Sequence, residues 1–369
     1  MNISVVYELA QKLENNSLTI CSKLRMKPIV ILPAGRLLGL CVNALKEYGL
    51  TVDKIADNAP EKKGKKINIS DKTYEISATK DILNEYGNGC NYIINSTIYY
   101  DEILAQLKNA GINDENIFDA PVYIGGLQDK NAFLRKLKVK ENEEEINSAL
   151  NNLYDDKSKQ ELVTLLAISI VNGPVFLKGN FAEEYFNIPY FSLDDNEVFV
   201  DGGMYDGRTS QRFIELCPLY DKVYGFEANK NQIKIIEENL KQYENVTIYE
   251  KAIYSKTDQL FFKELGEGSC LDENGTNVVE TVSIDECDIC PTYVKLDIEG
   301  AEYAALEGMK NTVAKYSPKF AIAIYHSLED HWRLINKIKE MDPKYNIAVM
   351  HHYGYEILYG SNLYAWKEK

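Results

Sequence analysis

Two acids and three glycines in the C-terminal half have the spacing of a ligand-binding loop. They are Asp201, Gly202, Gly203, Gly207 and Glu227. The first acid and the glycines follow a short strand-like run at 197–200 and precede an amphipathic helix, and Glu227 ends the next strand. Glycines let the backbone approach a ligand that a Cβ atom would block, and an acid at the tip of a second strand can accept both hydrogens of a ribose diol. This pattern predicts the nucleoside-binding half of a doubly wound sheet.

A second group of acids follows another apolar strand. The run Val294-Lys-Leu-Asp-Ile-Glu-Gly-Ala-Glu302 carries three carboxylates and one glycine. It resembles the V-K-x-D-x-E-G-x-E signature of FkbM-type methyltransferases, and the D-x-G-x-x-x-G spacing after Asp201 resembles motif one of S-adenosylmethionine-dependent methyltransferases. Further matching pieces occur in order over residues 180–369, half of the chain. They are Glu184-Tyr-Phe186, Phe226-Glu227, Ala252, Gly268-Ser269 and a strand ending at His326.

The resemblance implies a class I methyltransferase Rossmann-like sheet that binds S-adenosyl-L-methionine. The implied reaction is O-methylation of a hydroxyl on a sugar, a glycan precursor or a natural product. The residues implied for cofactor binding are Asp201, Gly202, Gly203, Gly207, Glu227, Ala252 and Asp297. Ser269 and Lys295 are assigned to the substrate side. No metal is expected, because the carboxylates have no second acidic cluster at ligand spacing.

An alcohol acceptor must lose its proton, so a base is useful, and the candidates are His326, Asp297 and Glu299. His326 follows an apolar strand at 321–325, although a lone histidine is often structural. Some relatives carry an acid just ahead of this histidine, where this chain has Ile324 and Tyr325.

The neighbours of these candidates have simpler interpretations as well. Lys295 is expected on the same side as Asp297, in a salt bridge that either orients Asp297 or is a plain structural pair. Glu302 is expected to be structural, and Glu299 has two interpretations, a catalytic group or a cap of the following helix.

Composition limits the class of protein. The chain has 369 residues and a net charge of −15, which favours two domains and disfavours nucleic acid and anionic membranes as partners. No signal peptide is evident, and the apolar run 162–171 is too short to span a bilayer. Seven scattered cysteines suit the cytoplasm. We expect a small-molecule or glycan acceptor, no nucleic acid and no membrane insertion; a homo-oligomer is compatible with the sequence.

The N-terminal half predicts a second, smaller Rossmann-like α/β domain. The expected divisions are a helix at 1–25, this domain at 26–125, a helical connector at 126–190 and the methyltransferase domain at 191–369. Asp57 follows Gly35 at 22 residues, near the dinucleotide spacing, but Pro33 stands where the first fingerprint glycine belongs. The sequence therefore favours a structural or partner-binding role. Two alternatives stay open: a nucleotide-binding oxidoreductase or sensor that uses this sheet, and a non-catalytic cofactor-binding scaffold.

Overall fold

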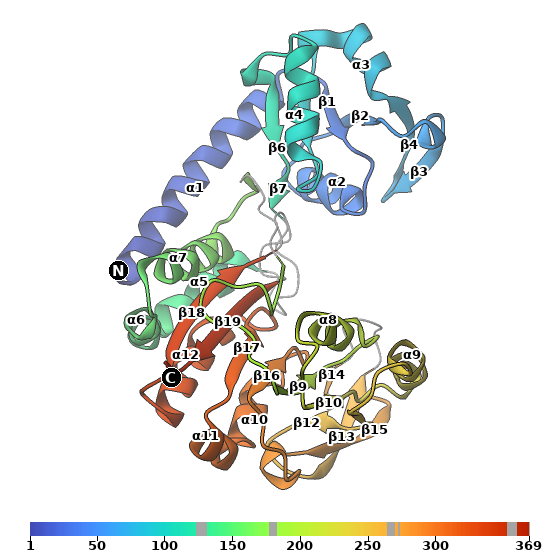
Figure 1. Ribbon diagram of the computed structural model, residues 1–369. Helices are drawn as coiled ribbons and strands as arrows, with labels where there is room; N and C mark the ends of the chain where they lie inside the picture. The colour runs from blue at the N-terminus through green and yellow to red at the C-terminus, as the bar shows by residue number, and fades with distance from the viewer. Residues whose placement is uncertain (123–130, 177–182, 264–269, 272–273, 353–359, 369) are drawn as a thin grey trace.

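The computed structural model describes residues 1–122, 131–176, 183–263, 270–271, 274–352 and 360–368. The two largest β-sheets, each covered by helices, lie at opposite ends of the molecule (Figure 1). Among the helices of these residues, none combines the length and the apolar character that crossing a lipid bilayer requires. The predicted class, α/β with two Rossmann-like sheets, is confirmed.

The N-terminal sheet has six strands in the order β3-β4-β2-β1-β5-β6. Strand β1 pairs in parallel with β2 on one side and β5 on the other, so the strand order reverses beside β1. Its strands are β1 (Ile29–Leu32), β2 (Val52–Asp57), β3 (Lys66–Ile69), β4 (Lys72–Ala78), β5 (Asn91–Ile94) and β6 (Ile117–Asp119). Its helices are α2 (Leu38–Glu47), α3 (Thr79–Tyr86) and α4 (Tyr100–Asn109). The antiparallel hairpin β3–β4 is an element that the sequence did not predict.

Both faces of this sheet are buried, because alternate residues of each strand point to opposite sides. Along β1, Ile29 and Ile31 pack with α2, whereas Val30 and Leu32 pack with α3 and α4. The sequence of a strand that is covered on both faces is a continuous run of apolar residues. This explains why the apolar run of β1 was recognisable in the sequence.

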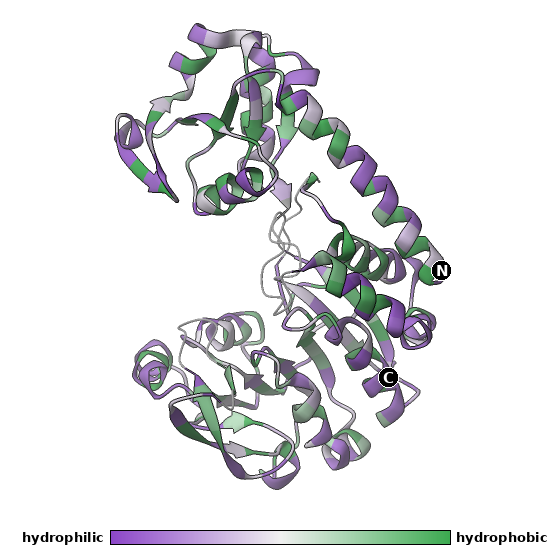
Figure 2. Ribbon diagram, turned by 180° about the vertical axis from the view of Figure 1, so that it is seen from behind, coloured by the Kyte–Doolittle hydropathy of each residue, from purple (hydrophilic) through white to green (hydrophobic). Residues whose placement is uncertain are grey.

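The long helix α1 (Ile3–Leu24) joins the two halves of the molecule (Figure 1). Its first part, including Val6 and Leu13, packs in the core of the C-terminal half, and its end at Leu24 packs under the N-terminal sheet. Figure 2 shows polar and apolar residues alternating along this helix. A second connection is the short antiparallel pair of β7 (Pro121–Val122) and β8 (Val175–Phe176). Two connections therefore set the position of the N-terminal sheet over the C-terminal half.

Three helices of the predicted connector share a core with the C-terminal sheet. They are α5 (Ala132–Glu141), α6 (Glu143–Asn152) and α7 (Asp156–Ile170). Leu166 of α7 lies in the same buried cluster as Ile347 and Leu363 of the C-terminal sheet. These helices therefore extend the C-terminal half rather than link two bodies, while the predicted domain boundaries themselves stay predictions.

The C-terminal sheet has seven strands in the order β11-β10-β9-β16-β17-β19-β18. All neighbours are parallel except β19, which is antiparallel to both β17 and β18. The strands are β9 (Val198–Gly202), β10 (Lys222–Phe226), β11 (Val246–Tyr249), β16 (Tyr293–Leu296), β17 (Lys319–Ala323), β18 (Asn346–His351) and β19 (Ser361–Trp366). The strands β18 and β19 thus form an antiparallel tail at one edge of the sheet.

Helices cover both faces of this sheet as well. Phe199 of β9 packs toward α8 (Arg208–Leu216), and the next residue, Val200, packs toward the opposite core. The remaining helices are α9 (Lys230–Leu240), α10 (Glu302–Glu307), α11 (Lys310–Tyr316) and α12 (Asp330–Met341). The helices α10 and α11 are separated at Gly308, where a Cβ atom would lie 2.3 Å from the carbonyl oxygen of Tyr254.

The segment between β11 and β16 forms a small sheet of its own. Its order is β12-β15-β13-β14, and the pairing of β13 with β15 is antiparallel. The strands are β12 (Ala252–Ile253), β13 (Asp258–Lys263), β14 (Cys270–Leu271) and β15 (Asn277–Val282).

Candidate active site

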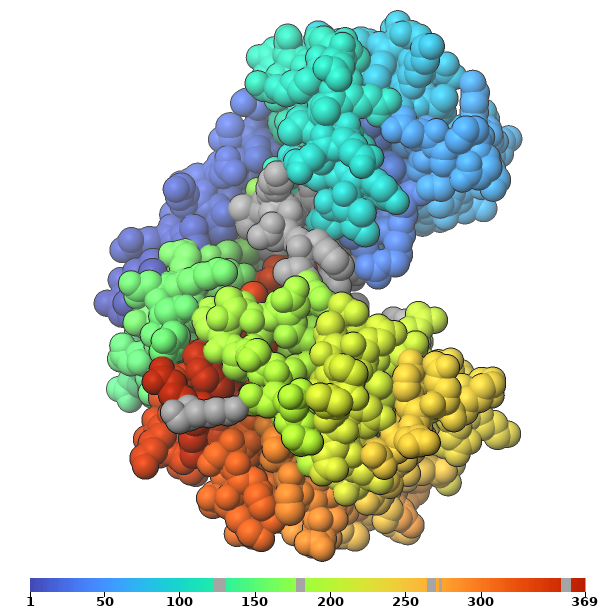
Figure 3. All heavy atoms as spheres, viewed as in Figure 1, coloured from blue at the N-terminus to red at the C-terminus, as the bar shows by residue number. Residues whose placement is uncertain are grey.

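A cavity of about 740 Å³ lies at the carboxyl ends of the central strands of the C-terminal sheet. Its walls come from the ends of β9, β10, β16 and β17 and from the start of β12. Arg36 and Leu40, which belong to the N-terminal sheet's first loop and helix, also line it. Figure 3 shows a deep cleft between the two halves on this side of the molecule. Ligands of doubly wound sheets bind where this cavity lies, outside the carboxyl ends of the strands.

The glycine loop after β9 forms one wall of the cavity, and its backbone requires glycine. Gly203 and Gly207 both have positive φ angles, of 78° and 83°. A Cβ atom on Gly203 would lie 1.9 Å from the backbone oxygen of Asp297. The loop therefore packs directly against the end of β16. Gly203 lines the cavity, whereas Gly202 and Gly207 support the loop from outside it.

Under this loop lies a buried ion pair between Lys295 and Asp201. The register of β9 and β16 places these two residues side by side, and Nζ lies 3.1 Å from Oδ1 of Asp201. Nζ also donates to the carbonyl oxygens of Gly202 (3.0 Å) and Gly203 (2.7 Å). Burial opposes the charge of Lys295, but Asp201 and the nearby acids outweigh it and raise the pKa. The expected salt bridge from Lys295 to Asp297 is therefore replaced by one to Asp201.

Asp201 does not line the cavity. Its side chain is fully buried, and its second oxygen accepts a hydrogen bond of 2.7 Å from the hydroxyl of Ser210 in α8. The acid that the sequence assigned to cofactor binding thus holds the lysine that supports the loop carbonyls. Its effect on a ligand can only be indirect, through the shape of the loop.

Glu227 lines the cavity at the end of β10. Its two carboxylate oxygens accept the backbone amides of Tyr205 (2.9 Å) and Asn229 (2.8 Å), which orients the group. Burial raises its pKa, and these two amide hydrogen bonds act in the opposite direction. Each oxygen keeps a second lone pair, so the carboxylate can still accept hydroxyl groups from a ligand.

Asp297 follows β16 and is held by two tyrosines. The hydroxyl of Tyr185 donates to Oδ2 (3.1 Å), and the hydroxyl of Tyr325 donates to Oδ1 (2.9 Å). Burial would raise its pKa, but Lys295, the imidazole of His326 and the two hydroxyls hold it below the usual value. Asp297 is therefore a fixed negative charge at neutral pH and a poor proton acceptor.

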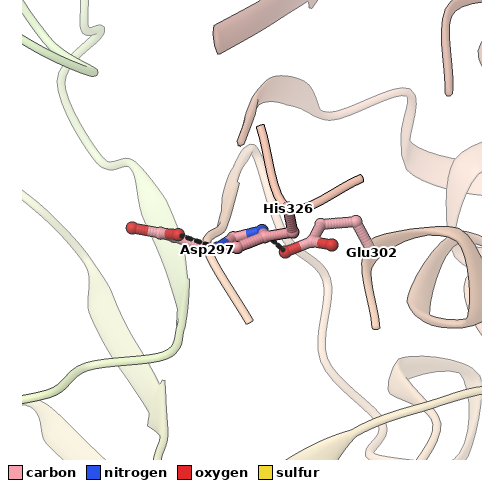
Figure 4. A group of neighbouring side chains, drawn as sticks. All are labelled: Asp297, Glu302 and His326. Atoms are coloured by element: carbon pink, nitrogen blue, oxygen red, sulfur yellow. Dashed lines mark ion pairs between the residues drawn. The ribbon is translucent and has the colours of Figure 1, made fainter. Parts of the chain in front are cut away.

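His326 lies between carboxylates at the end of β17 (Figure 4). Nδ1 is 2.9 Å from Oε1 of Glu302, and Nε2 is 3.4 Å from both Asp297 and Glu299. Burial opposes the imidazolium, but Glu302 and the other two acids outweigh it and raise the pKa to about 10. The imidazole is thus charged at neutral pH in this geometry. It does not line the cavity.

Glu299 does line the cavity, and its side chain is 31% exposed. Burial raises its pKa to about 7, the neighbouring His326 acting against this rise. Its φ is 56°, a left-handed conformation that side-chain-bearing residues rarely adopt and that costs on the order of 1–3 kcal/mol. Such strain is concentrated at functional sites. Of the three predicted bases, Glu299 has the pKa nearest to neutrality, where a general base is most effective.

Metal ligation is compatible with the residue types but not required by the geometry. In the described residues, ligand atoms of Asp297, Glu302 and His326 lie within 4.8 Å of one another. However, both ring nitrogens already face carboxylates, so a protonated imidazole accounts for the cluster by itself. The expectation of a metal-free site stays a prediction.

Two predicted site residues, Ala252 and Ser269, remain to be placed. Ala252 lines the cavity at the start of β12, and Ser269 lies outside the described residues. Sequence reasoning gave no role to Tyr185, Tyr325 or Arg36. Tyr185 stands in the quoted Glu184-Tyr-Phe186 segment, so a signal for it existed; Arg36 lies some 165 residues before Asp201, and only the tertiary structure brings it to the cavity.

In the N-terminal sheet, Asp57 stands at the position of Glu227 and lines a second cavity, but it has one partner more. Asp57 ends β2, but Oδ2 accepts the amide of Ala34 (2.9 Å) and pairs with Lys62 (2.9 Å), while Oδ1 accepts the amide of Ala59 (2.8 Å). Asp57 is 6% exposed. The carboxylate that would bind a ribose thus holds the loops of its own domain, which disfavours the nucleotide-binding alternative.

The strand order, with one antiparallel strand next to the last, is that of class I methyltransferases. Residues 201–357 match the family model of the methyltransferase FkbM domain. The C-terminal half therefore carries an FkbM methyltransferase domain, as its motifs predicted. The protein is an S-adenosylmethionine-dependent methyltransferase, and S-adenosylmethionine is its cofactor.

One solved structure agrees with the fold over the whole chain. The crystal structure of a methyltransferase FkbM from Methylobacillus flagellatus KT matches with a TM-score of 0.65 at 18% identity, and the match covers 98% of each chain. A precorrin-6y C5,15-methyltransferase from Geobacter metallireducens GS-15 has a TM-score of 0.33 at 16% identity, covering 47% of this chain and 82% of that one. Aeropyrum pernix fibrillarin, in complex with natively bound S-adenosyl-L-methionine, has a TM-score of 0.32 at 11% identity, covering 47% of this chain and 69% of that one. No curated protein sequence gives a significant match.

The charges of the cavity fit this cofactor. The charge of Lys295 is directed to Asp201 and to the loop carbonyls. Acids outnumber cations in the lining, which includes Glu184, Asp206, Glu227, Asp297 and Glu299 on one side of the balance and Arg36, Lys251 and Lys295 on the other. A ligand with a positively charged sulfur and an ammonium group is favoured by such a wall. Glu227 would hold the ribose hydroxyls, the loop at Gly203 would contact the methionine part, and Ala252 would face the adenine.

Proposed function

We propose that this protein transfers the methyl group to a hydroxyl of a sugar, in a glycan precursor or natural product, with Glu299 as the proton acceptor. The observation that carries the proposal is the pKa of Glu299, about 7, on a side chain that lines the cavity. A hydroxyl nucleophile needs a base to remove its proton, whereas an amine or thiolate acceptor depends less on such a base. We further propose a role in polysaccharide biosynthesis in the cytoplasm, where cysteines stay reduced; none of the seven forms a disulfide here.

In this mechanism the bound cofactor supplies a methyl group on a positively charged sulfur. Asp297, fixed by Tyr185 and Tyr325, keeps a negative charge beside that position. Glu299 orients the acceptor hydroxyl and takes its proton as the oxygen attacks. His326, protonated between Glu302 and the two other acids, holds Glu299 in place and is a positioning residue. Most of the rate enhancement would come from alignment, which can contribute up to about 7–11 kcal/mol.

The proton acceptor is tested by Glu299→Gln. Turnover with a sugar acceptor is expected to fall by about 100-fold or more, because a general base contributes about 10²–10⁴. In the unmodified protein, kcat is expected to rise with pH through about 7, since Glu299 acts only when deprotonated; the variant lacks this limb. Isothermal calorimetry with S-adenosylhomocysteine checks that the cofactor still binds. Glu238→Gln, on the exposed face of α9, is the matched control. An unchanged pH profile in Glu299→Gln contradicts the assignment.

The positioning role of His326 is tested by His326→Gln. The imidazolium lowers the pKa of Glu299, so its removal is expected to move the rising limb of the kcat profile above pH 7. If His326 were the base instead, the limb would disappear rather than shift. The pH dependence of kcat distinguishes the two roles, with calorimetry again confirming that cofactor affinity is retained.

A further inference from the structure

We propose that a second cavity, in the N-terminal sheet, binds a distal sugar unit of the same acceptor; this inference rests on the proposed function. The cavity has a volume of about 580 Å³ and lies at the carboxyl ends of β1, β2 and β5. It thus lies beside β1, where the strand order reverses. Open α/β sheets bind ligands at this position, so the location alone favours a small-molecule site.

Asn95 provides an unsatisfied donor in this cavity. It follows β5, lines the cavity and is only 4% exposed. Its side-chain nitrogen has no hydrogen-bond partner in the described part of the chain. A buried amide without a partner costs free energy, which a ligand oxygen would recover. The cavity therefore selects an occupant with a hydroxyl, ether or carbonyl oxygen at this point.

The rim of the cavity carries two exposed apolar side chains in succession, Ile98 (71% exposed) and Tyr99 (55% exposed). The hydroxyl of Ser96 accepts the amide of Tyr99 (3.1 Å), which fixes the turn that presents them. Pyranose rings have an apolar C–H face and a rim of hydroxyls. An aromatic ring at the mouth and a buried amide donor inside match these two sides.

A nucleotide fits this cavity less well than a sugar. The carboxylate of Asp57 is already occupied by the amides of Ala34 and Ala59 and by Lys62. The amide of Ala34, in the loop after β1, is directed to Asp57 and cannot face a phosphate. The acid that would bind a ribose is therefore neutralised by Lys62, and one amide of the first loop is already engaged within the protein.

Arg36 connects this cavity to the active site, because it lines both. It stands in the loop between β1 and α2, and Leu40 of α2 also lines the active-site cavity. An extended acceptor can therefore occupy both cavities at once, with its reacting hydroxyl near Glu299. This arrangement explains why a chain with a complete methyltransferase half also carries a second sheet fixed by α1.

The first experiment measures sugar binding to the full chain by saturation-transfer NMR. The probes are D-glucose, D-mannose, L-fucose, N-acetylglucosamine and glucuronic acid at millimolar concentration, with NAD as the nucleotide probe. At least one sugar is expected to bind, and Asn95→Leu is expected to weaken it by about fivefold to tenfold, the loss of one hydrogen bond. Tyr99→Ala, an exposed change that leaves folding unaffected, is expected to weaken it as well. Phe133→Ala, an equally exposed aromatic on α5, is the control.

The outcomes separate this inference from the proposed function. Glu227→Ala is expected to lose S-adenosylhomocysteine binding and to keep sugar binding, because the two cavities are distinct. The inference is overturned if none of the sugars binds, if binding survives both Asn95→Leu and Tyr99→Ala, or if NAD alone binds. None of these results depends on whether methyl transfer occurs.

The second experiment asks whether the bound sugar belongs to the acceptor. Oligosaccharides containing that sugar are tested for methylation with S-adenosylmethionine carrying a labelled methyl group. Tyr99→Ala and Asn95→Leu are each expected to raise the KM for the oligosaccharide by about fivefold to tenfold with kcat unchanged. A KM that stays constant in both variants, or no methylation of any oligosaccharide, overturns the acceptor assignment.

Discussion

The two large sheets of this protein are alike in one respect: the second strand of each ends in an acidic residue. In the N-terminal sheet, Asp57 is 6% exposed and binds two amides and Lys62 of its own domain. In the C-terminal sheet, Glu227 also binds two amides, but it has no ion pair among the described residues. Both acids line a cavity. The comparison teaches that an acid at this position holds the neighbouring loops, and that it stays open to a ligand only where no lysine of its own domain neutralises it.

The first loops of the two sheets differ in the same way. Gly203 has a positive φ and no room for a Cβ atom, whereas Gly35 has neither restriction, since nothing lies within 4 Å of its Cβ position. Gly203→Ala is therefore expected to abolish S-adenosylhomocysteine binding in calorimetry, and Gly35→Ala to leave it unchanged. An equal loss of S-adenosylhomocysteine affinity in both variants would mean that the two loops contribute equally to cofactor binding, which would contradict the difference between them.

Each sheet also has a lysine–aspartate pair below its first loop. Lys295 and Asp201 are 2% and 0% exposed, whereas Lys62 and Asp57 are 35% and 5% exposed. Lys295→Met leaves a buried charge unpaired and is expected to destabilise the protein by about 3–5 kcal/mol. Lys62→Met removes a half-exposed partner and is expected to cost about 1 kcal/mol or less. Denaturant unfolding measures the free energy of unfolding of both variants. Similar losses of stability would show that burial does not make the Lys295–Asp201 pair more important than the Lys62–Asp57 pair.

Substitution of the acids that end the second strands, Glu227 and Asp57, is expected to have the smallest effect. Glu227→Gln is expected to weaken S-adenosylhomocysteine binding by about tenfold, the value of one charge-assisted hydrogen bond. Asp57→Asn is expected to lower the free energy of unfolding without changing cofactor affinity. Calorimetry measures the cofactor affinity of both variants, and denaturant unfolding measures their stability. An Asp57→Asn variant with weakened cofactor binding would remove the distinction between a structural and a ligand-binding acid.

Much of the fold was accessible from the sequence because its signals are local. The strand β1 was recognisable as an apolar run, and the helix α4 by its end at Gly111, whose φ is 76°. The hairpin β3–β4 was missed because its strands, such as 66–69, are mostly polar and exposed. The division of the helix at Gly308 depends on a distant carbonyl, that of Tyr254, and such a contact leaves no local pattern.

The sequence by itself determined the residue types of the site: the glycines that a crowded loop requires, the acids at the strand ends and the histidine after β17. These follow from backbone sterics and strand periodicity, which act over a few residues. Only the tertiary structure decided that Lys295 pairs with Asp201, that His326 is enclosed by three carboxylates, and that Arg36 reaches the cavity. Ion pairing and burial depend on strand register and on desolvation among residues far apart in the chain, which no local pattern contains.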